Sequence, residues 1–161
     1  MKKLKYIFIF LLINFKVFSQ ESAPAGFMLK DLASEEVKMF QDVIESKPTI
    51  INFWATYCVP CKQEMPELQN LIKEFSEIQV IFINIDSSKE KEKVSQLVND
   101  WGITQTVLLD VYQVAAKAYI KPTPSVPATF LIRSDGKIMY KSVGYSKKTI
   151  PELREHLKKL K

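Results

Sequence analysis

The sequence predicts a single α/β domain whose central mixed sheet is covered by helices on both faces. Apolar, β-branched runs at residues 49–54 and 79–86 are typical of buried strands. Each run is followed by a segment with apolar residues at helical spacing, at 60–78 and 89–101. This strand–helix alternation, followed by a hairpin and a last helix, is typical of a sheet that contains both parallel and antiparallel strands.

Shorter elements are predicted around this core, and turn residues separate them. Residues 27–32 and 37–40 flank a polar turn and indicate an N-terminal hairpin. The turn Ser134-Asp135-Gly136-Lys137 indicates a second hairpin, with strands at 128–132 and 138–143. We also predict a helical turn at 41–46, a strand at 107–109, a short helix at 111–119 and an amphipathic helix at 150–160.

The net charge of +5 comes largely from the N-terminus. Four lysines (Lys2, Lys3, Lys5 and Lys16) lie within the first nineteen residues, which contain no acidic residue. The rest of the chain is nearly neutral, so its composition does not predict a basic face for nucleic acid. We therefore expect no nucleic-acid partner.

The same nineteen residues have the pattern of a signal peptide. A positive segment at 1–5 precedes an apolar segment at 6–15, and a cleavage site follows Ser19. The apolar segment is shorter than the roughly 20 residues that a spanning helix needs, although an uncleaved N-terminal anchor is the alternative. Either way we expect export to the periplasm, as a soluble domain or one held by that anchor. The predicted divisions are a signal peptide (1–19), a linker (20–26) and a folded domain (27–161).

The only two cysteines, Cys58 and Cys61, lie between a predicted strand and a predicted helix. In exported proteins cysteines usually form structural disulfides. A bridge across two residues closes too small a loop to remove much entropy from the unfolded chain, so stability explains this pair poorly. A Cys-x-x-Cys sequence at a strand–helix junction is instead typical of dithiol–disulfide chemistry.

The two cysteines are expected to have different roles. Cys58 should lie at the N-terminal edge of the helix, where unpaired N–H groups and the helix dipole favour a thiolate. It is therefore the predicted nucleophile toward a substrate disulfide, and Cys61, more buried, resolves the mixed disulfide. Pro60 suits the first helical turn. Because Val59 adds neither charge nor hydrogen-bond donor, we predict a reducing rather than an oxidising potential.

Two stretches resemble those of a known family. Residues 53–66 (FWATYCVPCKQEMP) resemble the active-site segment of the exported TlpA/ResA-type thiol-disulfide oxidoreductases, which have the thioredoxin fold. Residues 126–132 (VPATFLI), followed by Asp135-Gly136, resemble their cis-proline strand and hairpin. The resemblance covers residues 23–160. It implies a thioredoxin-like three-layer sandwich with an N-terminal hairpin and one extra strand–helix element at 85–102, and no cofactor beyond the Cys58–Cys61 disulfide.

Glu64 is the candidate proton handler. It follows Cys61 by three residues, so the two share a helix face. It also matches the acidic residue that the resembled group uses near its cysteines as a proton acceptor or pKa tuner. The alternative is a solvated carboxylate that merely suits the helix dipole. Asn52 stands where plain thioredoxin has a buried aspartate, which increases the importance of Glu64.

Four residues are predicted to contact the substrate. The resemblance implies that Pro127 is preceded by a cis peptide bond and that the backbone of Val126 is open to pairing with a substrate strand. Trp54 and Tyr57 flank the cysteines and are expected to pack beneath the site and frame its surface. Pro122 and Pro124 are interpreted as loop-stiffening residues, Trp101 as a core residue and His156 as a solvated side chain.

Other functions remain as alternatives. Two thiolates are half of a zinc site, but the chain has no further cysteine, and His156 is distant in sequence. Copper-delivery proteins of this fold usually add a histidine in the late loop, which residues 119–126 lack. The peroxidase cysteine pattern is absent, and a non-catalytic binding module would not need both cysteines. A disulfide oxidase or isomerase is a further alternative.

The resemblance also implies the partners. The expected clients are exported proteins with disulfides, such as the haem-attachment cysteines of apocytochrome c. Electrons would come from a membrane thiol carrier. We expect the chain to act as a monomer.

Overall fold

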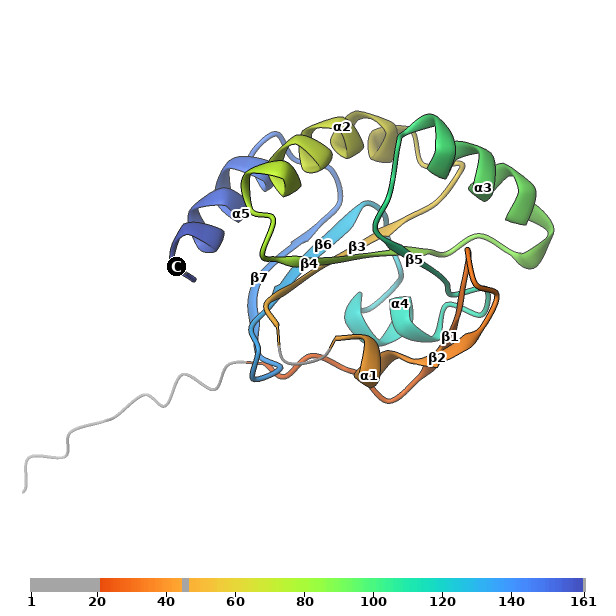
Figure 1. The fold of residues 1–161 in the computed structure, drawn as a ribbon, viewed down its shortest axis with the longest axis horizontal. Coiled ribbons are helices and arrows are strands. Elements are labelled where there is room, and N and C mark those ends of the chain that lie inside the picture. Colours follow the sequence, from red (N-terminus) through yellow and green to blue (C-terminus); the bar gives the residue numbers. More distant parts are fainter. Residues whose placement is uncertain (1–20, 45–46, 161) are drawn as a thin grey trace, which may run out of the picture.

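The computed structural model describes residues 21–44 and 47–160, which form a seven-stranded sheet in the order β2-β1-β5-β4-β3-β6-β7 (Figure 1). The strands are β1 (Met28–Asp31), β2 (Val37–Met39), β3 (Thr49–Trp54), β4 (Gln79–Asn84), β5 (Thr106–Leu109), β6 (Ala128–Ile132) and β7 (Ile138–Val143). Strand β4 pairs in parallel with β3 and β5, and the other pairs are antiparallel. The predicted mixed sheet is confirmed.

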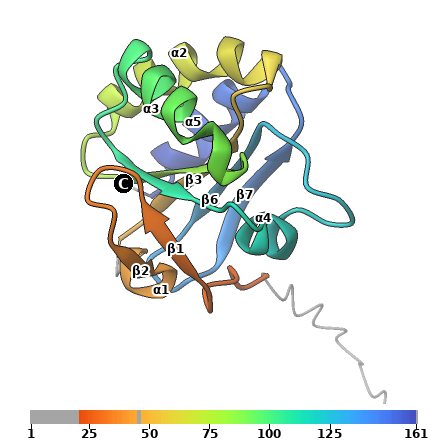
Figure 2. The same cartoon turned by 90° about the vertical axis from the view of Figure 1, so that its right-hand side faces the viewer.

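Helices cover both faces of this sheet. They are α1 (Phe40–Val43), α2 (Val59–Glu74), α3 (Lys91–Asp100), α4 (Val114–Tyr119) and α5 (Thr149–Lys158), with a 3₁₀ turn η1 (Ser88–Glu90) before α3. Helices α2, α3 and α5 lie on one face, and α1 and α4 lie on the other (Figures 1 and 2). The three-layer arrangement is therefore the one that the sequence predicts.

Strand β3 is buried along its whole length because it has a strand on each side and helices on both faces. Its apolar side chains alternate between the two faces, as expected for a central strand. Pairing with β6 sets Asn52 opposite Thr129, and pairing with β4 sets Trp54 opposite Asn84. The ends of β4 and β6 are thereby placed beside the segment that leads into α2.

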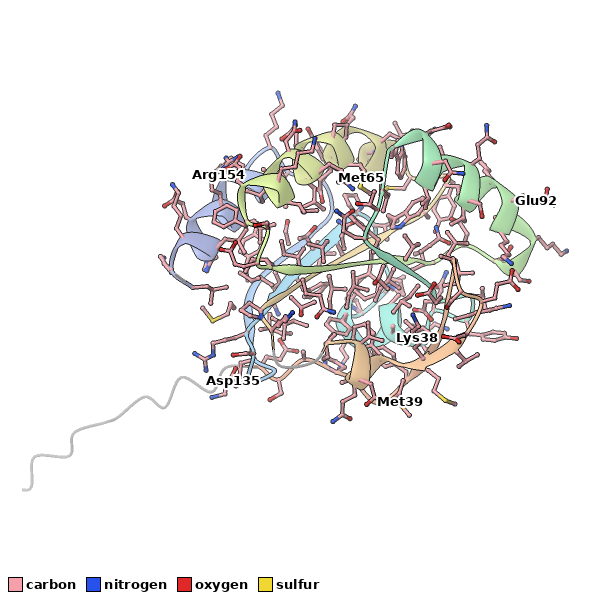
Figure 3. The ribbon with its side chains drawn as sticks, in the orientation of Figure 1. Lys38, Met39, Met65, Glu92, Asp135 and Arg154 are labelled. Carbon is pink, nitrogen blue, oxygen red and sulfur yellow. A yellow bond between two sulfur atoms is a disulfide. The ribbon has the colours of Figure 1, made fainter. Side chains whose placement is uncertain are left out.

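Helix α2 packs on the sheet through residues at helical spacing. The buried residues of this helix are Cys61, Glu64, Met65, Leu68, Leu71 and Ile72. Figure 3 shows Met65 pointing from α2 toward the sheet. Fully burying an apolar side chain of this size contributes roughly 1.5–3 kcal/mol, so this face holds the helix, and with it the cysteines, against the sheet.

The predicted extra strand–helix element at 85–102 is wrong in its order and bounds, because that range holds η1 and α3 but no strand. Helix α3 falls within the predicted range 85–102, and its strand follows that range as β5. Strand β5 lies between β4 and β1, so the N-terminal hairpin joins the sheet through β5.

The segment predicted as a linker is tied to the second hairpin. The Ala23 N–H donates to the Gly136 carbonyl (2.8 Å), and the Ile138 N–H donates to the Glu21 carbonyl (2.9 Å). Residues 21–23 therefore act as part of the domain edge, because their backbone groups pair with this hairpin. The predicted signal peptide at 1–19 lies outside the described residues, as do residues 45 and 46 of the predicted helical turn. No helix within 21–44 or 47–160 is long and apolar enough to cross a membrane.

Candidate active site

Cys58 and Cys61 form a disulfide at the N-terminus of α2, with their Cα atoms 5.3 Å apart. Cys58 is the N-cap residue, and its Sγ accepts a hydrogen bond from the Cys61 N–H at 3.1 Å. Sulfur therefore occupies the position where helix N–H groups stabilise negative charge. Both cysteines are buried, and Cys58, at 4% exposed, is slightly more accessible than Cys61, at 1%.

Glu64 is buried one helical turn after Cys61, with 3% of its surface exposed. The alternative of a solvated carboxylate is therefore wrong. Its Oε1 accepts hydrogen bonds from Thr129 Oγ1 (3.0 Å) and Asn52 Nδ2 (3.2 Å). Burial raises the pKa of the Glu64 carboxyl, these two hydrogen bonds oppose the increase, and the nearby Glu67 adds to it.

Pro127 is preceded by a cis peptide bond, as predicted. It lies directly before β6, whose Ala128 pairs with Phe53 near the end of β3. Pro127 is therefore at the end of the sheet from which the chain enters α2. A second cis bond precedes Pro122, for which the sequence predicted only loop stiffening.

Trp54 lies beneath the site and not on its surface. Its side chain is fully buried and packs on Trp101, with ring centroids 5.0 Å apart. Trp54 packs beneath the site as expected, but its predicted substrate contact is wrong, because its side chain has no solvent-accessible surface. Trp101, predicted as a core residue, is partly buried and packs against the core.

Tyr57 and Val59 flank Cys58 on the surface, with exposed fractions of 63% and 64%. A pocket of about 370 Å³ opens beside Tyr57, and its lining includes Asp86 and Lys93. Val126, next to Pro127, is half-buried. The surface around the buried disulfide therefore combines exposed apolar side chains with a polar hollow.

Asp86 is a site residue that sequence reasoning missed. It is buried just after β4, and its carboxylate accepts hydrogen bonds from the Thr56 N–H (2.7 Å), the Thr56 hydroxyl (3.0 Å) and Asn84 Nδ2 (2.7 Å). It therefore ties the segment before Cys58 to the end of β4. Its position directly after an apolar run could have indicated a role in the site, because functional sites of α/β sheets lie at the carboxyl ends of the strands.

His156 is also placed differently from the prediction. It is partly buried and packs against Tyr140, with ring centroids 5.2 Å apart. The sequence could not show this, because whether a histidine on a helix is solvated depends on which element packs against it. Here β7 packs against α5.

The possible ligands for a metal are sparse near the disulfide. Among the described residues, no group of three or more histidine, cysteine, aspartate or glutamate side chains could hold a metal ion. The redox group is the protein's own Cys58–Cys61 pair.

Comparisons with known proteins agree with this fold. The AhpC/TSA family model matches residues 20–141, so the chain belongs to the AhpC/TSA family. A thiol-disulfide oxidoreductase ResA of Halalkalibacterium halodurans is 31% identical over 135 residues, which cover 83% of this chain and 74% of that protein. The resemblance to ResA-type proteins is confirmed.

Solved structures share the fold. A secreted disulfide oxidoreductase of Mycobacterium tuberculosis, homologous to E. coli DsbE, has a TM-score of 0.69 at 20% identity, over 83% of this chain and 96% of that one. A thioredoxin-family thiol:disulfide interchange protein of Chlorobium tepidum has a TM-score of 0.69 at 21% identity, over 87% and 95%. These structures show the fold, and the ResA relatives together with the Cys-x-x-Cys pair define this chain as a thiol-disulfide oxidoreductase.

Glu64 should make stability depend on pH. The pKa of Glu64 is raised in the folded protein, so the fold favours the protonated carboxyl. This contribution to the free energy of unfolding is fully present below the ordinary pKa of a glutamate, and it is lost as pH rises through the pKa of the folded state. We expect Glu64→Gln to be more stable than the wild type at neutral pH and to lose this advantage in acid. Urea unfolding of the oxidised proteins across pH measures this. Glu92→Gln, a change of an exposed acidic residue on α3, is the control. Equal pH profiles for Glu64→Gln and wild type would refute the assignment.

Asp86 should be essential for the stability of the active-site segment. Asp86→Ala leaves the Thr56 N–H and the Asn84 amide buried without their acceptor, which costs on the order of 2–4 kcal/mol in unfolding free energy. Urea unfolding at neutral pH gives the value, with Glu92→Ala, an exposed acidic residue on α3, as the matched control. A loss no larger than that of Glu92→Ala would show that Asp86 does not anchor this segment.

Proposed function

We propose that this protein is exported and reduces disulfides in extracytoplasmic client proteins. The observation that carries the proposal is the Cys58–Cys61 pair at the N-terminus of α2, with one cysteine as the N-cap. The signal-like segment at residues 1–19 supports export. The solved M. tuberculosis protein of the same fold is itself a secreted protein.

In the proposed reaction the reduced Cys58 thiolate attacks one sulfur of a client disulfide. A bond forms between Cys58 Sγ and that sulfur, and the second client sulfur leaves as a thiolate and takes a proton from water. Cys61 then loses its proton to Glu64 and attacks Cys58 Sγ. The first client sulfur leaves as a thiolate and takes a proton from water, the Cys58–Cys61 disulfide forms, and two electrons have passed to the client.

The buried carboxylate suits this second step. Glu64 shares a helix face with Cys61, and its raised pKa brings it closer to that of a thiol, so proton transfer between them costs less. Asn52 cannot accept this proton in place of an aspartate, which leaves Glu64 as the proposed acceptor.

The client is proposed to bind along Val126 and Pro127 and over Tyr57. A strand that pairs beside Val126 would place its cysteine near Cys58, because Pro127 lies at the end of β6 next to the active-site segment. The exposed Tyr57 and Val59 offer apolar contact. We assign no client contact to Trp54, which is inaccessible.

The proposed clients are exported thiol proteins, including the haem-attachment cysteines of apocytochrome c. The proposed electron donor is a membrane thiol carrier, and the proposed functional unit is a monomer. The reducing direction follows from the dipeptide Val59-Pro60, which gives the Cys58 thiolate no charge or side-chain donor beyond the helix itself.

Trapping separates the two cysteine roles. Cys61→Ser cannot resolve the mixed disulfide, so we expect it to accumulate covalent client adducts on Cys58, identifiable by mass spectrometry after non-reducing electrophoresis. Wild type should reduce insulin disulfides, and Cys58→Ser should lose this turnover and form no adduct. Absence of dithiol turnover together with tight stoichiometric metal binding would instead favour a metal-delivery function.

A further inference from the structure

Three buried polar side chains from three different elements meet beneath the active-site helix. Asn52 comes from β3, Glu64 from α2 and Thr129 from β6, and each is at most 3% exposed. Asn52 Nδ2 donates to Glu64 Oε1 (3.2 Å) and to Thr129 Oγ1 (2.9 Å), and Thr129 Oγ1 donates to Glu64 Oε1 (3.0 Å). The three side chains form a closed triangle of hydrogen bonds.

The triangle leaves one strong acceptor unused. Asn52 Oδ1 is buried and has no hydrogen-bond partner among the described residues. An unsatisfied buried acceptor is costly, and such groups are rare in folded proteins. In this orientation both hydrogens of the amide nitrogen face acceptors, which suits a carboxylate at Glu64, but the amide then offers no acceptor to a protonated Glu64.

Rotation of the amide by a half turn would exchange its oxygen and nitrogen with almost no change of shape. Oδ1 would then face Glu64 and Thr129. That arrangement is unfavourable opposite a carboxylate, because two acceptors would oppose each other. It is favourable opposite a carboxylic acid, because the acid O–H and the Thr129 hydroxyl could both donate to Oδ1.

We propose that Asn52 is a positioning residue whose side-chain amide rotates by a half turn when the protonation state of Glu64 changes. Its nitrogen faces the carboxylate, and its oxygen faces the carboxylic acid. Toward Glu64 the amide thus offers a donor to the carboxylate and an acceptor to the acid, so the proton that Glu64 accepts finds a hydrogen-bond acceptor without any backbone movement.

Among the side chains around Glu64, Asn52 is the amide that can exchange a donor for an acceptor when Glu64 gains a proton. Strands β3 and β6 present Asn52 and Thr129 to the carboxyl, and neither side chain titrates. On its own helix the titratable neighbours are Glu67 and, in the reduced protein, the cysteine pair. An aspartate at position 52 could offer no N–H and would compete with Glu64 for one proton.

The use of this switch in catalysis rests on the proposed role of Glu64 as proton acceptor, whereas the rotation itself requires only that Glu64 titrates. NMR of the oxidised full chain isolates the rotation, because the disulfide-bonded cysteines do not titrate. Across pH we would record the Glu64 carboxyl ¹³C shift, the Asn52 side-chain ¹⁵N–¹H₂ signals and the NOEs between those amide hydrogens and Thr129. We expect one shared midpoint, with the Asn52–Thr129 amide NOEs lost on its acidic side.

Two matched variants decide the cause of any response. Glu64→Gln should abolish the Asn52 transition, and Glu67→Gln should retain it. Asn52→Asp should move the Glu64 midpoint to still higher pH, because a second carboxyl then faces the first. Asn52 signals that stay constant through the Glu64 midpoint, or a transition that persists in Glu64→Gln, would overturn the proposal.

A kinetic experiment links the switch to turnover. In the reduced protein, Asn52→Leu should slow Cys61-dependent release of a client from the mixed disulfide by roughly tenfold, because a protonated Glu64 loses its acceptor. Thr129→Val, which keeps Asn52, should slow it less. An unchanged release rate in Asn52→Leu would contradict the catalytic use of the rotation. Failure of insulin reduction by the wild type would count against the proposed function and leave the NMR result intact.

Discussion

The pairing of β3 with β4 on one side and with β6 on the other determines where every part of the site lies. Through β6 it sets Asn52 opposite Thr129 and leaves Pro127 at the end of the sheet where the chain enters α2. Through β4 it sets Trp54 opposite Asn84, next to the carboxylate of Asp86. A slip of one residue in either pairing would turn these side chains to the opposite face. The site therefore depends on the register of the central strand more than on any single contact.

Buried carboxylates occur at three places in this fold. Glu64, Asp86 and Asp110 are each nearly inaccessible, and each accepts at least two hydrogen bonds. Asp110 receives the N–H groups of Val114 and Ala116 at the start of α4, and burial raises its pKa although these bonds oppose the increase. Asp86 and Asp110 hold backbone segments in place. Glu64 is bonded only to side chains, so a change in its protonation breaks no backbone hydrogen bond.

Much of this architecture could be predicted from the sequence. The strands, the helices and the cysteine pair follow from local patterns, since apolar runs, turn residues and helical spacing act over a few neighbouring residues. The burial of Trp54 could not be predicted, because an aromatic side chain at a strand end can face either the interior or the substrate. The role of Asp86 and the packing of His156 on Tyr140 depend on neighbours far away in the sequence. The hydrogen bonds of residues 21–23 to the second hairpin are likewise a tertiary contact that no local pattern encodes.

The central functional claim is that Cys58 and Cys61 donate electrons, and their reduction potential tests it most directly. The full-length protein would be equilibrated with graded thiol–disulfide buffers and its reduced fraction measured. We expect a value near that of thioredoxin, about −270 mV. A value near that of DsbA, about −120 mV, would contradict it and would indicate a protein that introduces disulfides.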